Sequence, residues 1–193
     1  MKTTKKNLFT DLVRTLRRAG EVERYHTVGT LRRDTVGTHS HNVAILCYIL
    51  SEGEPSKDLL MAALLHDIPE VQYGDIPGDM KRVMPEEHLD HLHAAERSFL
   101  DELHYNYVFG SHFDSLTILE KHILKLSDLF EGLLFCAVER SMGNQSIEFV
   151  FRNYSNYILD HINKYTLAHG RRAIDEEMYN SINTIWEEAH YAR

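Results

Sequence analysis

The sequence predicts an all-α fold, a bundle of helices with a polar site in its core. Apolar residues recur every three or four positions through most of the 193-residue chain, as in amphipathic helices. We find no sustained alternation of apolar and polar residues, and none of the glycine-rich phosphate-binding motifs of α/β nucleotide-binding folds. The length suits one domain, and no repeat, low-complexity segment or linker divides the chain.

Glycines, prolines and capping residues set the expected helix boundaries. The expected helices cover residues 6–19, 39–52, 55–66, about 85–103, 114–141, 146–168 and 173–190. Thr38 is expected to cap the second helix. Pro69 is expected to break or kink the chain after the third, because a residue before proline avoids α geometry. Three segments are expected to be irregular, namely 21–37, 72–83 and 104–113. The first of them contains β-like pieces.

Composition and charge exclude several classes of function. The chain has no run of about 18 apolar residues that could span a membrane, and its basic N-terminus is not followed by a signal-peptide core. The net charge of −8 argues against stable nucleic-acid binding. Cys47 and Cys136 lie in apolar helical patterns and are interpreted as reduced core thiols, with no cysteine-based zinc site. We expect a cytoplasmic protein.

The most informative stretch is the adjacent pair His66 and Asp67 at the end of an apolar helical run. Alone, such a pair is more often a polar helix end facing water. However, His39 opens an earlier helix, and Asp128 lies within the longest apolar helix, where an unpaired carboxylate is costly. Two imidazoles and two carboxylates from three helices would neutralise a divalent cation and leave positions open for water and substrate.

These residues resemble a known family, the HD-domain metal-dependent phosphohydrolases. More narrowly, the chain is similar to the YfbR-like 5′-deoxynucleotidases and to the DatZ-type phage dATP triphosphohydrolases. The similarity is strongest over residues 8–140, and the helices over 145–193 are expected to be part of the same HD domain, which spans 1–193. The matching stretches are Arg24-Tyr25, Thr35 to Ser40, His66 to Val71, Gly74 to Pro77 with Lys81, and Lys125 to Asp128.

The resemblance implies a role for each matching position. The implied metal ligands are His39, His66, Asp67 and Asp128. The implied catalytic residues are Glu70, as general base or acid, and Asp75, as a hydrogen-bond acceptor for the sugar or an aid to proton transfer. The implied substrate-binding residues are Arg24, Tyr25, Lys81 and Lys125. The chain departs from the family at two positions, with Thr38 in place of an acidic residue and Tyr25 in place of a tryptophan near the sugar.

The first hypothesis for function is a dNTP triphosphohydrolase, acting on dATP, that releases deoxynucleoside and triphosphate. The alternatives are a 5′-deoxynucleotidase that removes phosphate from a dNMP, a hydrolase of a signalling nucleotide, and a non-catalytic nucleotide sensor. The implied cofactor is a divalent metal (Co, Mn, Zn, Mg, Fe or Ni), which the ligand types alone cannot select. The implied partners are a small deoxynucleotide and further copies of the chain, as a dimer or larger homo-oligomer. If the gene belongs to a phage, the expected location is the host cytoplasm.

Two other features receive structural interpretations. The histidine-rich patch over 88–93 is interpreted as an exposed polar helix, and the aromatic run over 149–157 as core or a subunit interface.

Overall fold

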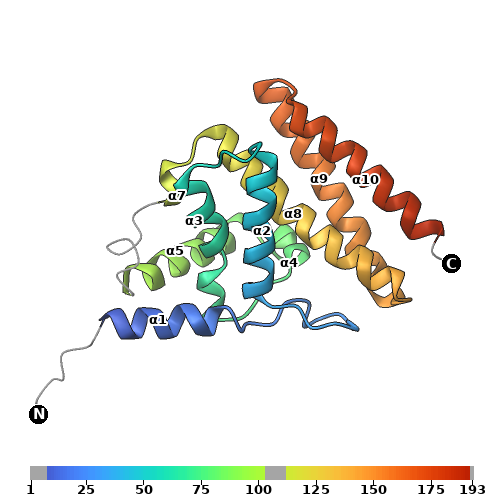
Figure 1. Ribbon diagram of the computed structural model, residues 1–193. Helices are drawn as coiled ribbons and strands as arrows, with labels where there is room; N and C mark the ends of the chain where they lie inside the picture. Colours follow the sequence, from blue (N-terminus) through green and yellow to red (C-terminus); the bar gives the residue numbers. More distant parts are fainter. Residues whose placement is uncertain (1–7, 103–111, 192–193) are drawn as a thin grey trace, which may run out of the picture.

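The computed structural model describes residues 8–102 and 112–191, and within these ranges every regular element is helical (Figure 1). The only β-type pairing among the described residues is an isolated bridge between Glu23 and Thr35. The prediction of an all-α fold is therefore confirmed. The α-helices are α1 (Leu8–Ala19), α2 (Val36–Leu50), α3 (Lys57–Leu65), α4 (Gly78–Val83), α5 (Glu86–Glu102), α7 (His112–Ser115), α8 (Ile118–Ser141), α9 (Glu148–His169) and α10 (Ala173–Tyr191), and 3₁₀ turns cover η1 (Ile68–Val71) and η2 (Gln145–Ile147).

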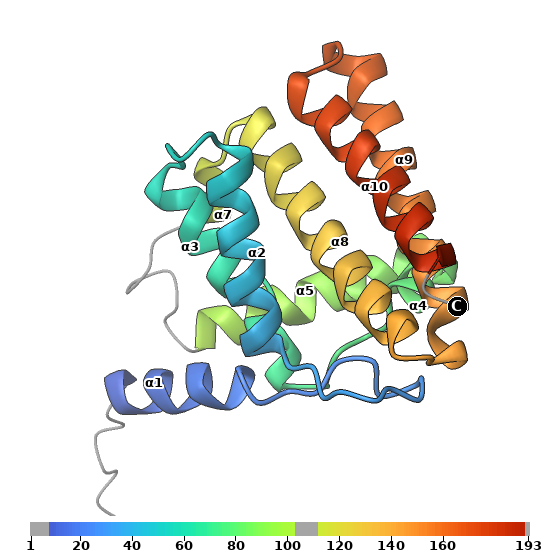
Figure 2. The same ribbon diagram turned by 45° about the vertical axis from the view of Figure 1, so that its right-hand side comes forward.

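Helix α8 lies at the centre of the bundle, between the α2–α3 pair on one side and the α9–α10 pair on the other (Figures 1 and 2). Each side has its own apolar cluster. Leu126, Leu133 and Phe151 belong to the cluster shared with α9 and α10. Val43 and Ile123 belong to the cluster shared with α2 and α3. Because α8 is buried on both sides, polar side chains on it must find partners within the bundle.

Local sequence explains where α8 starts. The Thr117 side chain accepts a hydrogen bond from the Glu120 amide, and the Glu120 carboxylate accepts one from the Thr117 amide. This reciprocal capping box satisfies two free backbone donors at the helix N-terminus. It places the start four residues later than the expected residue 114, and the expected end at 141 is confirmed.

Two expectations about the first half of the chain are wrong. Helix α2 begins at Val36 with Thr35 as its cap, not Thr38, because the chain packs closely at Gly37, whose amide donates to the carbonyl of Gly20. A Cβ on Gly37 would approach that carbonyl oxygen to 2.8 Å, so the helix start is fixed by packing against the end of α1.

The second wrong expectation is the loop over 72–83, which contains the short helix α4. Its Asp79 accepts hydrogen bonds from Asn153 and Tyr157 of α9, and the Arg82 guanidinium lies over the Tyr157 ring. A helix of six residues is too short to be stable alone, so these tertiary contacts are what hold it.

The C-terminal helices are joined to α8 by buried polar contacts as well as apolar ones. His122 of α8 lies 3.0 Å from the His161 Nε2 of α9 and donates from Nε2 to Asp175 of α10 at 2.7 Å. Asp175 is fully buried, so its carboxylate requires this partner. The interpretation of the aromatic run over 149–157 as core is confirmed for Phe151, which is fully buried, whereas Phe149 is exposed.

Other expectations are met by the described residues. Cys47 and Cys136 are free and buried. His88, His91 and His93 are exposed on α5. Among the helices that the structure describes, none is long and apolar enough to cross a membrane.

Gly132 of α8 provides a packing test of this arrangement. A Cβ at this position would overlap the Tyr154 ring of α9, because the ring lies directly against the glycine. We expect Gly132→Ala to lower the free energy of unfolding by about 1–3 kcal/mol through overpacking, measured by urea denaturation. Gly29→Ala is the matched control, since a Cβ there meets nothing closer than 3.9 Å and should leave stability unchanged. Equal stability of the two variants would contradict the close packing of α8 on α9.

Candidate metal centre

Three helical elements place the predicted metal ligands around one point. His39 lies in the first turn of α2, His66 directly follows α3, and Asp67 precedes η1. Asp128 lies near the middle of α8. Packing of α2 against both α3 and α8 brings these positions together, although His39 and Asp128 are 89 residues apart in the chain.

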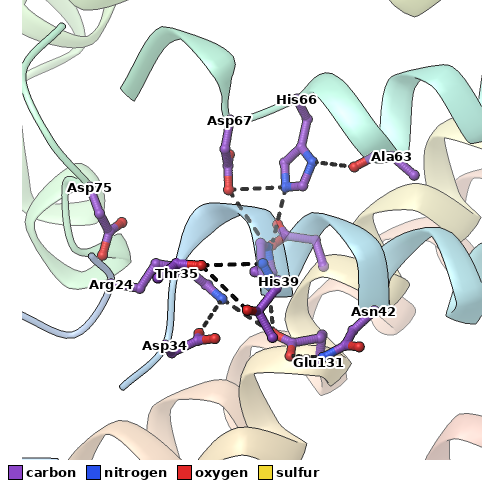
Figure 3. Close-up of polar contacts among 12 residues, drawn as sticks. Arg24, Asp34, Thr35, His39, Asn42, Ala63, His66, Asp67, Asp75 and Glu131 are labelled. Atoms are coloured by element: carbon purple, nitrogen blue, oxygen red, sulfur yellow. Dashed lines mark hydrogen bonds and ion pairs between the residues drawn. The ribbon is translucent and has the colours of Figure 1, made fainter. Parts of the chain in front are cut away.

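The ligand atoms lie within a few ångströms of one another. The Nε2 atom of His39 is 3.2 Å from Asp128 Oδ1 and 3.6 Å from Asp67 Oδ2. The Nε2 atom of His66 is 3.2 Å from Asp67 Oδ2 and 4.0 Å from Asp128 Oδ1. Ligand bonds of about 2.1 Å to a transition metal put neighbouring ligand atoms roughly 3–3.5 Å apart. His39, His66 and Asp128 satisfy the spacing of a metal-binding group. Asp67 lies beside the two histidines (Figure 3).

The hydrogen-bonding state of the two imidazoles supports metal binding. The Nε2 atoms of His39 and His66 are both buried, and neither has a hydrogen-bond partner of acceptable geometry. The other ring nitrogen of each histidine is used, since His66 Nδ1 lies 2.9 Å from the Ala63 carbonyl and His39 Nδ1 lies 2.5 Å from Glu131 Oε2. Each Nδ1 therefore donates a hydrogen, which leaves each Nε2 as the ring atom available to bind an ion. These residues fit a divalent cation with nitrogen and oxygen ligands.

The charges of the centre shift the pKa values of its members strongly. Burial alone would lower the pKa of His66, but the Asp67 carboxylate outweighs it and raises the pKa to about 9. Burial and Arg24 would lower the pKa of His39, and the carboxylates of Asp128 and Glu131 raise it above its ordinary value. Burial opposes ionisation of Asp67 and Asp128, yet the adjacent cationic groups hold both pKa values below the usual range. Without an ion, protons on the imidazoles balance the two carboxylates.

Glu70 lies beside this centre in an unusual state. Its side chain is buried, and its Oε2 atom has no hydrogen-bond partner. Burial, followed by the negative charges of Asp67 and Asp75, raises its pKa to about 9. Asp75 accepts a hydrogen bond from the Tyr25 amide at 3.4 Å. The structure thus brings both predicted catalytic carboxyls close to the predicted ligands.

Arg24 and Tyr25 reach the centre from the loop between α1 and α2. The Arg24 Nη1 atom lies 3.2 Å from both Asp34 Oδ2 and Glu131 Oε2. The Tyr25 ring is only 8% exposed and stacks on Phe135 with a centroid distance of 4.6 Å. Its hydroxyl lies 3.3 Å from the Tyr154 hydroxyl of α9. Tyr25 is therefore packed into the wall of the site rather than projecting from it.

Lysines on α4 and α8 add positive charge at this end of the molecule. Lys125 donates to Asp128 Oδ2 at 2.7 Å, and its side chain is half-exposed. Lys81 lies close enough to Glu70 to oppose the rise of the Glu70 pKa. Arg82 lies close enough to Lys125 to oppose the rise of the Lys125 pKa. On the α4–α8 side, Lys125 thus contacts a predicted ligand, and Lys81 and Arg82 lie within electrostatic range of Glu70 and Lys125.

Several residues of the centre were not identified from the sequence. They are Asp34, Asn42, Glu131 and Tyr154. A signal existed for Glu131, which lies about one helical turn after Asp128 and is the only charged residue between 129 and 138, so that it neighbours Asp128 on the helix. No comparable signal marked Tyr154, because its role depends on how α9 packs against α8.

Comparison with known proteins finds a matching family model and solved structures with a similar fold. A family model described as 5′-deoxynucleotidase YfbR-like matches residues 11–178. No curated protein matches the sequence. The fold is similar to that of the cyanophage S-2L HD phosphohydrolase DatZ bound to dA and one catalytic Zn²⁺ ion, with a TM-score of 0.69, 18% identity, and coverage of 97% of this chain and 99% of that one.

Two further solved structures share the fold. An HD-domain phosphohydrolase from Listeria innocua aligns with a TM-score of 0.64 and 19% identity over 96% of this chain and 99% of its own. A predicted metal-dependent phosphohydrolase from Magnetospirillum magnetotacticum aligns with a TM-score of 0.61 and 16% identity over 96% of this chain and 92% of its own.

Metal affinity is expected to rise with pH. A bound ion must displace the proton from His66, whose pKa is about 9, so affinity increases as pH rises from 6.5 toward 9 and then levels off. The slope should reach about tenfold per pH unit for each proton displaced. Chelator competition with Mn²⁺ at several pH values measures it. His41→Ala, which removes an exposed histidine of α2, should leave the slope unchanged. A pH-independent affinity would show that the imidazoles do not bind the ion.

Asp128→Ala is expected to abolish metal binding and turnover together. The substitution removes a carboxylate that both imidazoles face. Replacing a residue that only supports a metal ligand lowers metal affinity by up to roughly 100-fold, and the loss here should be larger. Mn²⁺ titration followed by a turnover assay measures both. Asp160→Ala, at an exposed carboxylate of α9, is the charge-matched control. Full activity of Asp128→Ala would show that the ligand assignment is wrong.

Proposed function

Because the chain belongs to the YfbR-like 5′-deoxynucleotidase family, it is a metal-dependent phosphohydrolase. We propose that its substrate is a dNTP, namely dATP, which it hydrolyses to deoxynucleoside and triphosphate. The alternative within the family is removal of the single phosphate of a dNMP. Both reactions break the same bond, between phosphorus and the 5′-oxygen of the sugar. They differ only in whether further phosphates are attached to that phosphorus, so contacts to the phosphate chain must distinguish them.

The observation that carries the proposal is the number of cations beside the predicted ligands. Lys81, Arg82 and Lys125 lie on the α4–α8 side, and Arg24 lies on the opposite loop. A single phosphate needs few such partners, whereas a triphosphate carries about four negative charges that require neutralisation. A second observation agrees with a purine deoxynucleoside, since the similar fold of DatZ holds dA.

The predicted ligands and cationic residues each have a role in this proposal. His39, His66, Asp67 and Asp128 hold the divalent ion, which supplies Lewis-acid stabilisation of the phosphoryl oxygens and lowers the pKa of water. Arg24 binds phosphate oxygens, and Lys81 and Lys125 bind the rest of the chain. The oxygen of water forms the new bond to phosphorus as the bond to the 5′-oxygen breaks, and the proton that the water loses replaces the one that Glu70 gives to the 5′-oxygen.

Glu70 fits the proton transfer that this reaction needs. Burial is the largest cause that raises its pKa, so its protonated form is favoured, and that form can give its proton to the departing 5′-oxygen of the sugar. Asp75, which also accepts from the Tyr25 amide, would orient the sugar at the same end of the site. A nucleotide sensor would need neither carboxyl, which makes the non-catalytic alternative the weaker one.

The proposal extends to the whole chain and its assembly. We propose that residues 1–193 form a single HD domain. Helix α9 supplies Tyr154 to the wall of the site, and Asn153 of the same helix holds α4 by a hydrogen bond to Asp79. We also propose a homo-oligomer, in keeping with the apolar side chains exposed on α2, Ile45, Tyr48 and Ile49.

The test is a product assay by ion-exchange chromatography and mass spectrometry. Protein loaded with Mn²⁺ or Co²⁺ is incubated separately with each dNTP, dNMP and rNTP. Triphosphate and deoxyadenosine from dATP are the expected products. Phosphate from dNMPs, with dNTPs left intact, would overturn the triphosphohydrolase proposal in favour of the deoxynucleotidase. No turnover of any substrate, with Asp128→Ala as the inactive reference, would overturn both.

A further inference from the structure

Two buried carboxylates of α8, Glu131 and Glu139, lie outside the predicted ligand set. Glu131 is 5% exposed and uses both of its oxygens. Its Oε1 accepts from the Asn42 amide at 3.1 Å. Its Oε2 accepts from His39 Nδ1 at 2.5 Å and from Arg24 Nη1 at 3.2 Å (Figure 3). One oxygen atom therefore contacts a predicted metal ligand and the predicted phosphate-binding arginine at once.

The contact with His39 determines which ring nitrogen faces the centre. A carboxylate can only accept a hydrogen bond, so the Nδ1 atom of His39 carries the hydrogen and the Nε2 atom presents its lone pair. Nε2 is buried without a hydrogen-bond partner and faces Asp128 and Asp67. The negative charge of Glu131 also increases the basicity of the ring toward a cation.

The second contact of Glu131 holds the Arg24 guanidinium, the predicted phosphate-binding group, in place. The guanidinium is clamped between Asp34 of the loop and Glu131 of α8, and its side chain is only 8% exposed. Asp34 belongs to the same loop as Arg24, whereas Glu131 belongs to the central helix that also carries Asp128. Glu131 is thus the contact that ties Arg24 to the central helix.

From these contacts we propose that Glu131 is a positioning residue that orients His39 toward the metal ion and holds Arg24 in register with it. This carboxylate links the ion to the phosphate-binding arm, so its loss weakens both metal binding and substrate binding. The metal-binding half of the proposal is independent of the substrate, and the substrate-binding half rests on the proposed function.

Glu139 supplies a matched comparison. It is also a buried glutamate of α8, and it holds the same loop by accepting from the amides of Leu31 and Arg32 and from Asn144. None of its hydrogen bonds in the described structure reaches His39 or Arg24. If Glu131 only anchored the loop, replacing either glutamate would have the same consequences.

The test compares Glu131→Gln with Glu139→Gln. Glutamine keeps the shape and an acceptor oxygen but loses the charge. Mn²⁺ affinity of each metal-free protein is measured by chelator competition, without nucleotide. Glu131→Gln is expected to weaken affinity by about 10- to 100-fold, the usual range for a carboxylate behind a ligating histidine. Glu139→Gln is expected to change it less than about twofold. Unchanged affinity in Glu131→Gln, or equal weakening in both variants, would overturn the proposal.

A second readout addresses the histidine directly. Long-range ¹H–¹⁵N spectra of the Zn²⁺-loaded protein report which nitrogen of His39 carries hydrogen. Nδ1–H is expected in the wild type, and a tautomer protonated at Nε2 would overturn the proposal. Circular dichroism at the assay temperature confirms that each variant is folded. If Glu131→Gln unfolds, the affinity measurement is made instead on Asn42→Ala, which removes only the contact to Oε1 of Glu131. Asn42→Ala is then expected to weaken Mn²⁺ affinity by a smaller factor in the same direction, and unchanged affinity would count against the proposal.

The substrate-binding half is measured with whichever nucleotide the wild type hydrolyses, at saturating Mn²⁺. Glu131→Gln is expected to raise KM by several-fold with a smaller change in kcat, because Arg24 then keeps only one negatively charged partner, Asp34. A fall in kcat with unchanged KM would overturn this half. If the wild type hydrolyses no nucleotide, the proposed function fails, while the affinity measurement still decides the role of Glu131.

Discussion

Four carboxylates lie in or beside the core around His39, and they can be there only because each has a cationic or hydrogen-bonding partner. Asp34 is paired with Arg24, Glu131 with His39 and Arg24, Asp67 with His66, and Asp128 with Lys125. An unpaired carboxylate in this position would cost several kcal/mol. The need to neutralise these charges therefore decides which loop, helix and turn must meet at the centre of the bundle.

Apolar packing brings the elements together, and the polar partners determine their exact register. Helices α2 and α3 pack on α8 through Val43, Leu59 and Ile123. That packing alone tolerates small shifts along each helix axis, since apolar contacts are not directional. The hydrogen bonds of Glu131 to Asn42 and His39 allow only one register of α2 on α8. The same contacts that complete the site thus also specify the fold.

The main helices and the candidate metal ligands could be predicted from the sequence because both are marked by local patterns. Helical periodicity marks α8, and the adjacent His66 and Asp67 mark the centre of the ligand set. The cap of α2 is less predictable, since Thr35 and Thr38 are chemically equivalent and the close approach of Gly37 to Gly20 makes the choice. Helix α4 has no strong signal of its own, because its stability comes from Asn153 and Tyr157, some 75 residues later.

The spacing of charged residues on α8 explains how one helix serves several parts of the site. Lys125, Asp128 and Glu131 follow one another at intervals of three residues, so each member of the row lies beside the next but is turned by roughly 60° around the helix axis. With a rise of 1.5 Å per residue, the three groups are spread over roughly 9 Å along the axis. The row therefore winds from the surface of the helix into the core. Lys125 is half-exposed at the outer end, Asp128 faces the two imidazoles, and Glu131 is buried against His39 at the inner end. A shift of α8 by one turn would bring the wrong charge to each position, which explains why the helix is capped and packed on both sides.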